Sequence, residues 1–238
     1  MKALAAILFP LVFVGLTAAE DLPTPPDQIV SNYCNATEFQ ERSFDGTSME
    51  VEIQASLPKL KKRGRLHGLR RISKLGRITY EHLAFEGDGT VKNQVIARYL
   101  NTEVDAHDEQ STALALTPAN YKFSYKSKGM VDGRPAYLFS VSPRKKRLGL
   151  FKGELWMDAA TYLPVLESGY LVKSPSIFLK RVAFVRRFEI RDGISVPRQI
   201  ASTVNTRIWG TAQLEIDYSN FSVDDSAPPP PSGENDGQ

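Results

Sequence analysis

The stretch "KGELWMDAATYLPV", residues 152–165, predicts a β-strand that ends at a turn and a second strand that follows it. Residues 152–158 alternate as an extended chain does, residues 159–161 interrupt the pattern, and residues 163–165 resume it. The stretch contains no nucleophile elbow, metal-binding cluster or phosphate-binding loop. A chain built from such strands is expected to form a sheet whose apolar face must be covered.

Both ends of the chain are expected to lie outside the folded domain. Lys2, the apolar run 3–16 and the small residues up to Ala19 have the pattern of a secretory signal peptide that is cleaved near Ala19. The residue immediately after the cleavage position is Glu20 and not a cysteine, so we expect no lipid anchor. Residues 227–238 include four consecutive prolines and are expected to be a disordered Pro-rich tail. We therefore expect a single domain, residues 20–226, exported to the periplasm.

Composition limits the kinds of function that the chain can support. Hydrophobic residues make up 42% of the sequence, which is enough for a core, and the single cysteine, Cys34, cannot form an internal disulfide. His67, His82 and His107 do not have the spacing of metal ligands, so we expect no metal and no cofactor. The net charge is only +3, so any electrostatic role must come from local clusters. We expect a monomer.

Two segments have helical periodicity. Residues 24–27 form a helix-start signature and apolar residues follow at helical spacing, which predicts a helix over residues 25–42. After a turn at residues 88–90, apolar residues from Val91 to Val104 recur every three or four positions and predict a second amphipathic helix.

Most of the remaining chain alternates with a period of two, which is typical of strands with one apolar face. In residues 48–57, every second side chain is apolar. Similar patterns occur at residues 121–126, 182–191, 196–208 and 212–218. Turn signals that predict hairpins lie at Asp132-Gly133, Ser168-Gly169 and Asp192-Gly193.

Two helices are too few to cover the apolar faces of so many strands in a flat sheet. The sheet is therefore expected to curve into a barrel or half-barrel, with the helices closing its mouth. Such an interior can leave a hollow that is large enough for an apolar ligand.

The sequence gives no support to a catalytic site. Carboxylate pairs such as Glu81 with Glu86, or Glu154 with Asp158, could act as general acid and base, but nothing favours one pair over another. Glu154 and Asp158 share a strand face with Lys152, which indicates solvated ion pairs between strands. No Gly-x-Ser-x-Gly motif stands between a strand and a helix. We therefore expect that the chain is not an enzyme.

The run "KLKKRGRLHGLRRISKLGR", residues 59–77, is rich in basic residues and has no acidic one, and shorter basic runs lie at residues 144–147 and 180–187. Export argues against nucleic acid as the partner. An anionic membrane surface is the alternative, because each Lys or Arg near it contributes about 1 kcal/mol. The residues expected to make this contact are Lys61, Lys62, Arg63, Arg70 and Arg71. The competing interpretation is that these charges lie on solvated hairpin tips.

Three stretches of the sequence resemble a known family. They are "VDGRPAYLFSVSPRKKRLGLFKGELWMDAATYLPVLESG" at residues 131–169, "FEIRDGISVPRQI" at 188–200 and "TAQLEIDYSNFSV" at 211–223. Their motifs are Asp-Gly-x-x-x-Tyr, Trp-x-Asp, Thr-x-Leu-Pro and Asp-Gly-x-x-x-Pro. In these motifs the chain resembles the LolA-like family of exported bacterial proteins, which are outer-membrane lipoprotein-sorting proteins and their relatives. The resemblance covers residues 119–223 well and residues 25–118 more loosely.

The resemblance implies an α+β, mainly β fold, in which a curved antiparallel sheet forms an open (unclosed) β-barrel with a small helical lid. It also implies a periplasmic carrier or binding protein for lipid or lipoprotein acyl chains. Burial of each methylene is worth about 0.8 kcal/mol, so a dry cavity would hold an acyl chain strongly. The basic run at residues 59–77 and the Pro-rich tail depart from the family pattern.

Candidate ligand contacts follow from this hypothesis. The cavity is expected to be lined by Val51, Ile53, Phe123, Leu155, Phe184 and Phe188, and the lid helix to contribute Val95, Tyr99 and Leu100. Each of these side chains could equally be an ordinary core residue. Two other functions stay open. One is a non-enzymatic envelope sensor or scaffold that binds a protein partner, and the other is an enzyme with polar groups in a cleft.

Overall fold

The computed structural model describes residues 24–41, 44–74, 77–108, 114–175 and 177–223. The expected signal peptide, residues 1–19, and the expected tail, residues 227–238, lie outside these described residues.

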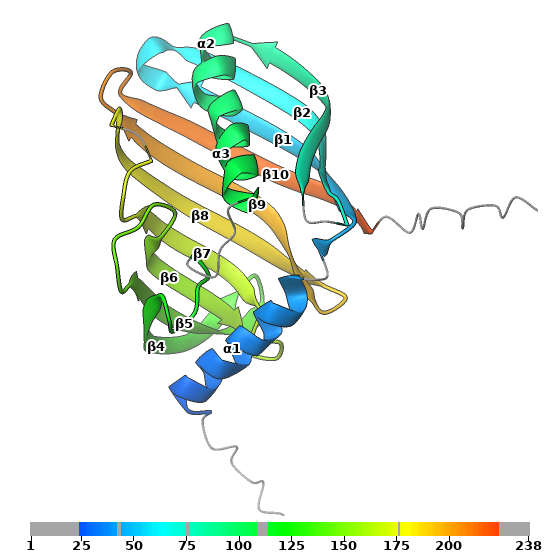
Figure 1. The fold of residues 1–238 in the computed structure, drawn as a ribbon, viewed down its shortest axis with the longest axis vertical. Coiled ribbons are helices and arrows are strands. Elements are labelled where there is room, and N and C mark those ends of the chain that lie inside the picture. The colour runs from blue at the N-terminus through cyan, green and yellow to red at the C-terminus, as the bar shows by residue number, and fades with distance from the viewer. Residues whose placement is uncertain (1–23, 42–43, 75–76, 109–113, 176, 224–238) are drawn as a thin grey trace, which may run out of the picture.

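Within the described residues, ten strands form one antiparallel sheet in the order β3-β2-β1-β10-β9-β8-β7-β6-β5-β4. Their bounds are β1 Thr47–Leu57, β2 Lys62–Ile72, β3 Ile78–Gly87, β4 Tyr121–Val131, β5 Arg134–Pro143, β6 Phe151–Asp158, β7 Pro164–Leu171, β8 Leu179–Arg191, β9 Ile194–Thr206 and β10 Thr211–Val223. Strands β3 and β4 are the two edges, so the sheet is not closed. The prediction of an open, mainly β fold with few helices is confirmed (Figure 1).

Both expected helices are present. Helix α1 spans Pro26–Glu41, and the second helical segment consists of α2 (Gly89–Val91), a π-helical turn η3 (Lys92–Ile96) and α3 (Ala97–Asp108). Asp88 begins this second segment, because its side chain accepts a 2.7 Å hydrogen bond from the backbone N–H of Thr90. Among the described helices, none is both long and apolar enough to cross a bilayer.

The two helical segments cover different parts of the same face of the sheet. Ile29 and Tyr33 of α1 pack with buried side chains of β4, β5 and β6. Ile96 and Leu100 of the second segment pack with buried side chains of β1, β2 and β10. The face therefore holds two hydrophobic cores, one beneath each helical segment, with β8 and β9 between them (Figure 1).

The stretch at residues 152–165 forms the end of β6, a turn and the start of β7, as its pattern predicts. Asp158 is buried, and its Oδ1 accepts hydrogen bonds from the backbone N–H groups of Ala160 (3.1 Å) and Thr161 (2.8 Å). Arg134 Nε donates to Asp158 Oδ2 at 2.9 Å. Asp158 therefore organises the turn, and the expectation that it forms a solvated ion pair is wrong.

The hairpin turn expected at Ser168-Gly169 is also absent from its predicted place. Both residues lie within β7, where Gly169 is opposite Gly153 of β6. A β-carbon built on Gly153 would overlap the carbonyl oxygen of Ser168. These glycines therefore permit close approach of two strands, whereas Asp132-Gly133 and Asp192-Gly193 do form the predicted turns.

Candidate functional site

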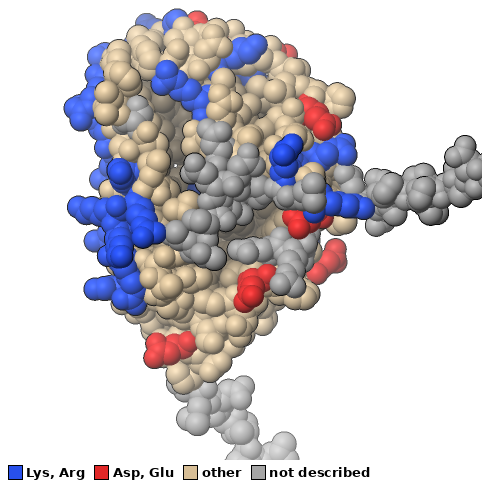
Figure 2. Space-filling model, viewed as in Figure 1, with Lys and Arg blue, Asp and Glu red and all other residues tan. Residues whose placement is uncertain are grey.

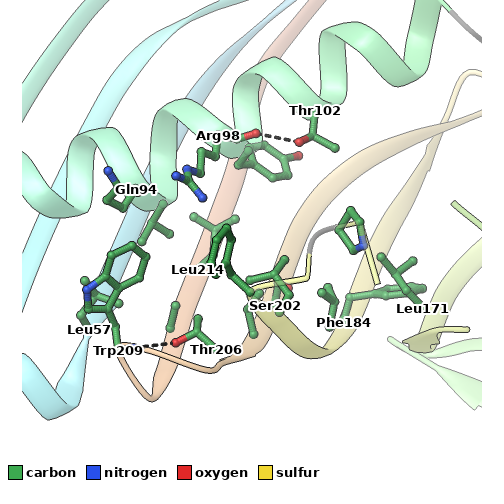
Figure 3. A pocket seen from close by; sticks show the side chains of 18 of the residues that line it. Leu57, Gln94, Arg98, Thr102, Leu171, Phe184, Ser202, Thr206, Trp209 and Leu214 are labelled. Atoms are coloured by element: carbon green, nitrogen blue, oxygen red, sulfur yellow. Dashed lines mark hydrogen bonds between the residues drawn. The ribbon is translucent and has the colours of Figure 1, made fainter. Parts of the chain in front are cut away.

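A cavity of about 490 Å³ lies between the two cores, beneath the second helical segment. Its floor consists of β8, β9 and the start of β10, its roof is η3 and α3, and its end wall includes Pro175, Phe178 and Trp209. In Figure 3, side chains from the helix and from the sheet point toward one another across this space. The volume lies within the range of about 300–1,000 Å³ that is usual for ligand pockets.

Burial distinguishes the floor of the cavity from the rest of the same sheet face. Val51 and Ile53 of β1 are 1% and 0% exposed because the helical segment packs directly on them. Ile200 and Val204 have the corresponding orientation on β9, yet they are only half-buried and line the cavity. The apolar surface of β9 is therefore only partly covered by the side chains of the described residues.

The lining is mainly apolar, with a few polar groups on the roof. Gln94 and Arg98 come from the helical segment and line the cavity (Figure 3). Gln94 Oε1 is buried and has no hydrogen-bond partner among the described residues. On the floor, Arg186 donates to Glu167 Oε2 at 3.3 Å and stacks over the ring of Phe184.

The described lining of the cavity contains few groups that could take part in a chemical reaction. No Asp, Glu, His, Lys or Cys occurs among the described residues that line it. Across the described part of the chain, no three His, Cys, Asp or Glu side chains are grouped so as to hold a metal ion. The arrangement can enclose an apolar chain and bind a polar group at its end, and its described lining supplies no carboxylate, imidazole or amine as a general base.

Polar contacts fasten the helical segment on the side that faces β2 and β3. At its start, Lys62 of β2 lies 3.3 Å from Asp88. Near its end, Glu103 accepts hydrogen bonds from Arg70 Nε at 2.9 Å and from the hydroxyl of Tyr80. Burial opposes the charge on Arg70, but the carboxylate of Glu103 outweighs this effect and the pKa of Arg70 lies above its ordinary value.

Three tyrosines complete this polar cluster. Tyr99 of α3 and Tyr218 of β10 have hydroxyl oxygens 3.4 Å apart. Burial raises the pKa of Tyr218 to about 12 and also raises the pKa values of Tyr80 and Tyr99 above their ordinary value. The phenols therefore stay neutral at physiological pH.

The structure places the expected ligand contacts in several different environments. Phe184, Val95 and Tyr99 line the cavity. Val51, Ile53 and Leu100 lie in the core beneath the second helical segment, and Leu155 and Phe123 lie in the core near α1. Phe188 is half-buried farther along β8, where it pairs with Pro197. A role of these residues in ligand binding stays a prediction.

Several lining residues were missed by sequence reasoning. They are Leu57, Leu171, Ile200, Ser202, Val204, Trp209 and Leu214. The shared face of Ile200 and Val204 was visible in the alternation of residues 196–208. Nothing in that pattern distinguishes a strand covered by a helix from one that faces a cavity, since both need the same apolar face.

The residues expected to meet an anionic surface do not form one patch. Lys61 is exposed at the β1–β2 turn and Arg63 on β2, while Lys62 is partly exposed beside Asp88. Arg71 is partly exposed and lies 3.5 Å from Glu81. Arg70 is buried against Glu103, so the prediction that it contacts a surface is wrong. Alternation along β2 sends these side chains to opposite faces.

The fold of this chain is similar to those of several solved structures. No family model and no curated protein sequence matches the chain. A DUF1329 family protein from Desulfovibrio piger is similar in structure, with 16% identity, a TM-score of 0.44, and coverage of 84% of this chain and 94% of that one. A LolA superfamily protein from Nitrosomonas europaea has 12% identity and a TM-score of 0.38, with coverage of 84% and 94%.

A third structure is described as an outer membrane lipoprotein-sorting protein domain from Vibrio parahaemolyticus. It has 14% identity and a TM-score of 0.39, and the match covers 81% of this chain and 92% of that domain. Structures of the LolA-like class are thus among those similar to this chain, as the sequence motifs predict. The likeness concerns the fold, and the function of this chain is inferred from its own cavity.

Proposed function

We propose that this chain is an exported, non-enzymatic carrier or binding protein for lipid or lipoprotein acyl chains in the bacterial cell envelope. The observation that carries the proposal is the half-burial of Ile200 and Val204 over a cavity of about 490 Å³. On an apolar floor of this kind, ligand binding is stabilised by about 0.8 kcal/mol for each methylene of the ligand that is removed from water. A mainly apolar lining, with no carboxylate, imidazole or amine among its described residues, fits binding rather than chemistry.

The polar groups of the roof favour a ligand with a polar end. Gln94 Oε1 is buried without a partner among the described residues and can accept a hydrogen bond from an amide or hydroxyl group. Arg98 lies one helical turn further along the roof and can meet a carboxylate or phosphate. An acyl chain would lie on the floor of β8 and β9, with its polar end toward the helix.

A cavity-filling variant tests the proposal. Val204→Trp places a large side chain in the cavity, whereas Thr203→Trp adds the same side chain to the opposite, exposed face of β9. Native mass spectrometry of protein purified from its own envelope fraction should detect a bound acyl chain with wild type and Thr203→Trp, but not with Val204→Trp.

The same three proteins are then titrated with a fluorescent fatty acid. We expect Val204→Trp to raise the Kd at least tenfold and Thr203→Trp to leave it unchanged. A wild-type protein that is consistently empty and does not bind the fatty acid contradicts the proposal, as does equal binding by both variants.

A further inference from the structure

Four connections between strands lie together at one end of the sheet. Because neighbouring strands are antiparallel, the β1–β2, β9–β10, β7–β8 and β5–β6 connections all occur at the same strand ends. We call them the loop edge, which comprises residues 58–61, 207–210, 172–175 with 177–178, and 144–150. In Figure 1 this edge is on the left.

Hydrogen bonds and packing join these connections into one surface. The backbone N–H of Val172 donates to Leu150 at 3.0 Å, which links the β7–β8 and β5–β6 connections. Arg207 donates from its backbone N–H and from Nε to the carbonyl oxygens of residues 178 and 177, both at 2.8 Å. The side chain of Lys59 packs beside Gly210 and brings the β1–β2 turn against the β9–β10 turn.

Large apolar side chains are exposed on every one of the four connections. Ile177 is 79% exposed and Ile208 is 57% exposed, and Leu60, Leu148 and Phe178 are exposed as well. Exposed apolar side chains that gather on one surface of a folded protein mark a site of interaction. Phe178 and Ile208 also line the cavity, so the apolar surface continues from the cavity to the loop edge.

Basic side chains surround these apolar residues. The four connections contain Lys59, Lys61, Lys173, Arg207 and the run 144–147, and their sequences contain no Asp or Glu. In Figure 2, Lys and Arg gather along the corresponding edge. Two turns at the opposite end of the strands instead contain Asp132 and Asp192.

We propose that the loop edge docks on the surface of an anionic phospholipid bilayer. Apolar side chains at several loop tips can enter the interfacial region, while the surrounding cations meet the headgroup phosphates. Of the residues expected from the sequence to meet an anionic surface, only Lys61 belongs to the loop edge. The others lie on β2, which presents alternate side chains and pairs Arg70 and Arg71 with carboxylates. Docking would also bring the cavity wall at Phe178 and Ile208 to the membrane. Only the idea that docking helps to transfer an acyl chain rests on the proposed function. The docking itself does not depend on it.

Vesicle flotation of the full mature chain tests this proposal. The probes are vesicles of phosphatidylcholine alone and of phosphatidylcholine mixed with phosphatidylglycerol. We expect binding to the anionic vesicles only, and weaker binding as salt is raised. Lys145→Glu/Lys146→Glu and, separately, Ile177→Ser/Ile208→Ser should each lower the partition coefficient at least tenfold. All these side chains are exposed, so the variants should keep the wild-type unfolding midpoint.

A matched variant separates local contact from net charge. Lys126→Glu/Lys128→Glu makes the same change in charge at exposed positions on β4, away from the loop edge, and should alter the partition coefficient less than twofold. An equal loss in this control overturns the proposal, and so does unchanged binding by either loop-edge variant. Absence of wild-type binding also overturns it and points instead to an acidic protein surface. Val204→Trp should float like wild type, so a failure of docking is distinguishable from a failure of ligand binding.

Discussion

Arg70 on β2 reaches Glu103 on α3 through both Nε and Nη2, each 2.9 Å from Oε1 of the carboxylate. The two side chains are only 10% and 19% exposed, and Tyr80 bonds the second oxygen of Glu103. This contact holds the helical segment on its β2–β3 side, whereas the cavity lies toward β8 and β9. The ion pair therefore fixes the end of α3 to β2, on the side away from the cavity.

Glu103→Gln should weaken this attachment. The substitution leaves the Arg70 guanidinium buried without a countercharge, which costs about 3 kcal/mol of unfolding free energy. We expect this loss in urea denaturation, together with faster hydrogen exchange of the α3 amides. Glu189→Gln breaks an exposed pair with Arg191, 3.0 Å apart, and should cost less than about 1 kcal/mol.

A double variant checks the physical reason. Arg70→Met/Glu103→Leu removes both charges and should recover most of the stability that Glu103→Gln loses, because no buried charge is left unpaired. If the double variant is less stable than Glu103→Gln, the cost comes from lost packing and the ion-pair explanation is wrong.

The Asp158 carboxylate should make stability depend on pH. Burial opposes its ionisation, but the hydrogen bonds from Arg134, Ala160 and Thr161 outweigh this effect and hold the pKa of Asp158 below its ordinary value. Its stabilising contribution is therefore complete above the unfolded-state pKa of about 3.9 and is lost as pH falls through the lower folded-state pKa.

Unfolding free energies of wild type and Asp158→Asn measure this contribution. At neutral pH we expect Asp158→Asn to be less stable by about 2 kcal/mol, and the difference should shrink below about pH 4. A difference that stays constant from neutral to acidic pH would show that the ionised form of Asp158 is not what stabilises the turn.

Local patterns predicted the parts of the fold that depend on neighbouring residues. The alternation of residues 48–57 predicted β1, and the helical spacing of residues 25–42 predicted α1. The Asp-Gly pairs predicted the turns at residues 132–133 and 192–193. Ser168-Gly169 was misassigned because a glycine that permits a turn and one that permits close strands look alike in sequence. Here the deciding neighbour, Gly153, lies on another strand.

The site was less predictable because it depends on which strands the helices cover. Ile53 and Val204 lie in similar alternating patterns, but only Ile53 is fully buried beneath the second helical segment, whereas Val204 is half-buried and lines the cavity. Arg70 was assigned to a surface because its partner, Glu103, lies far along the chain on another element. Both facts follow from tertiary packing, which no local pattern records.

Gly153→Ala should disrupt the sheet where β6 and β7 approach closely. The added methyl group would overlap the backbone of Ser168, so the two strands must separate, and we expect a loss of about 3 kcal/mol in urea denaturation. Gly89→Ala is the control, because a β-carbon at Gly89 meets nothing within 4 Å at the start of a helix. It should be neutral or slightly stabilising. Equal effects of the two substitutions would contradict the proposed close approach.

Gln94→Met should make the empty protein more stable and reduce its selectivity between ligands. The buried Oε1 of Gln94 has no partner among the described residues, so an apolar side chain of similar length should raise the unfolding free energy of the empty protein by about 1 kcal/mol. The same oxygen should favour a ligand with an N–H donor. Wild type is therefore expected to bind a fatty amide more tightly than the corresponding methyl ester, and Gln94→Met to reduce this preference several-fold.

Gln54→Met, at an exposed position of β1, should change neither the unfolding free energy nor the preference for the amide. A Gln94→Met protein that is less stable and equally selective would mean that Gln94 supports the helix and does not face the ligand.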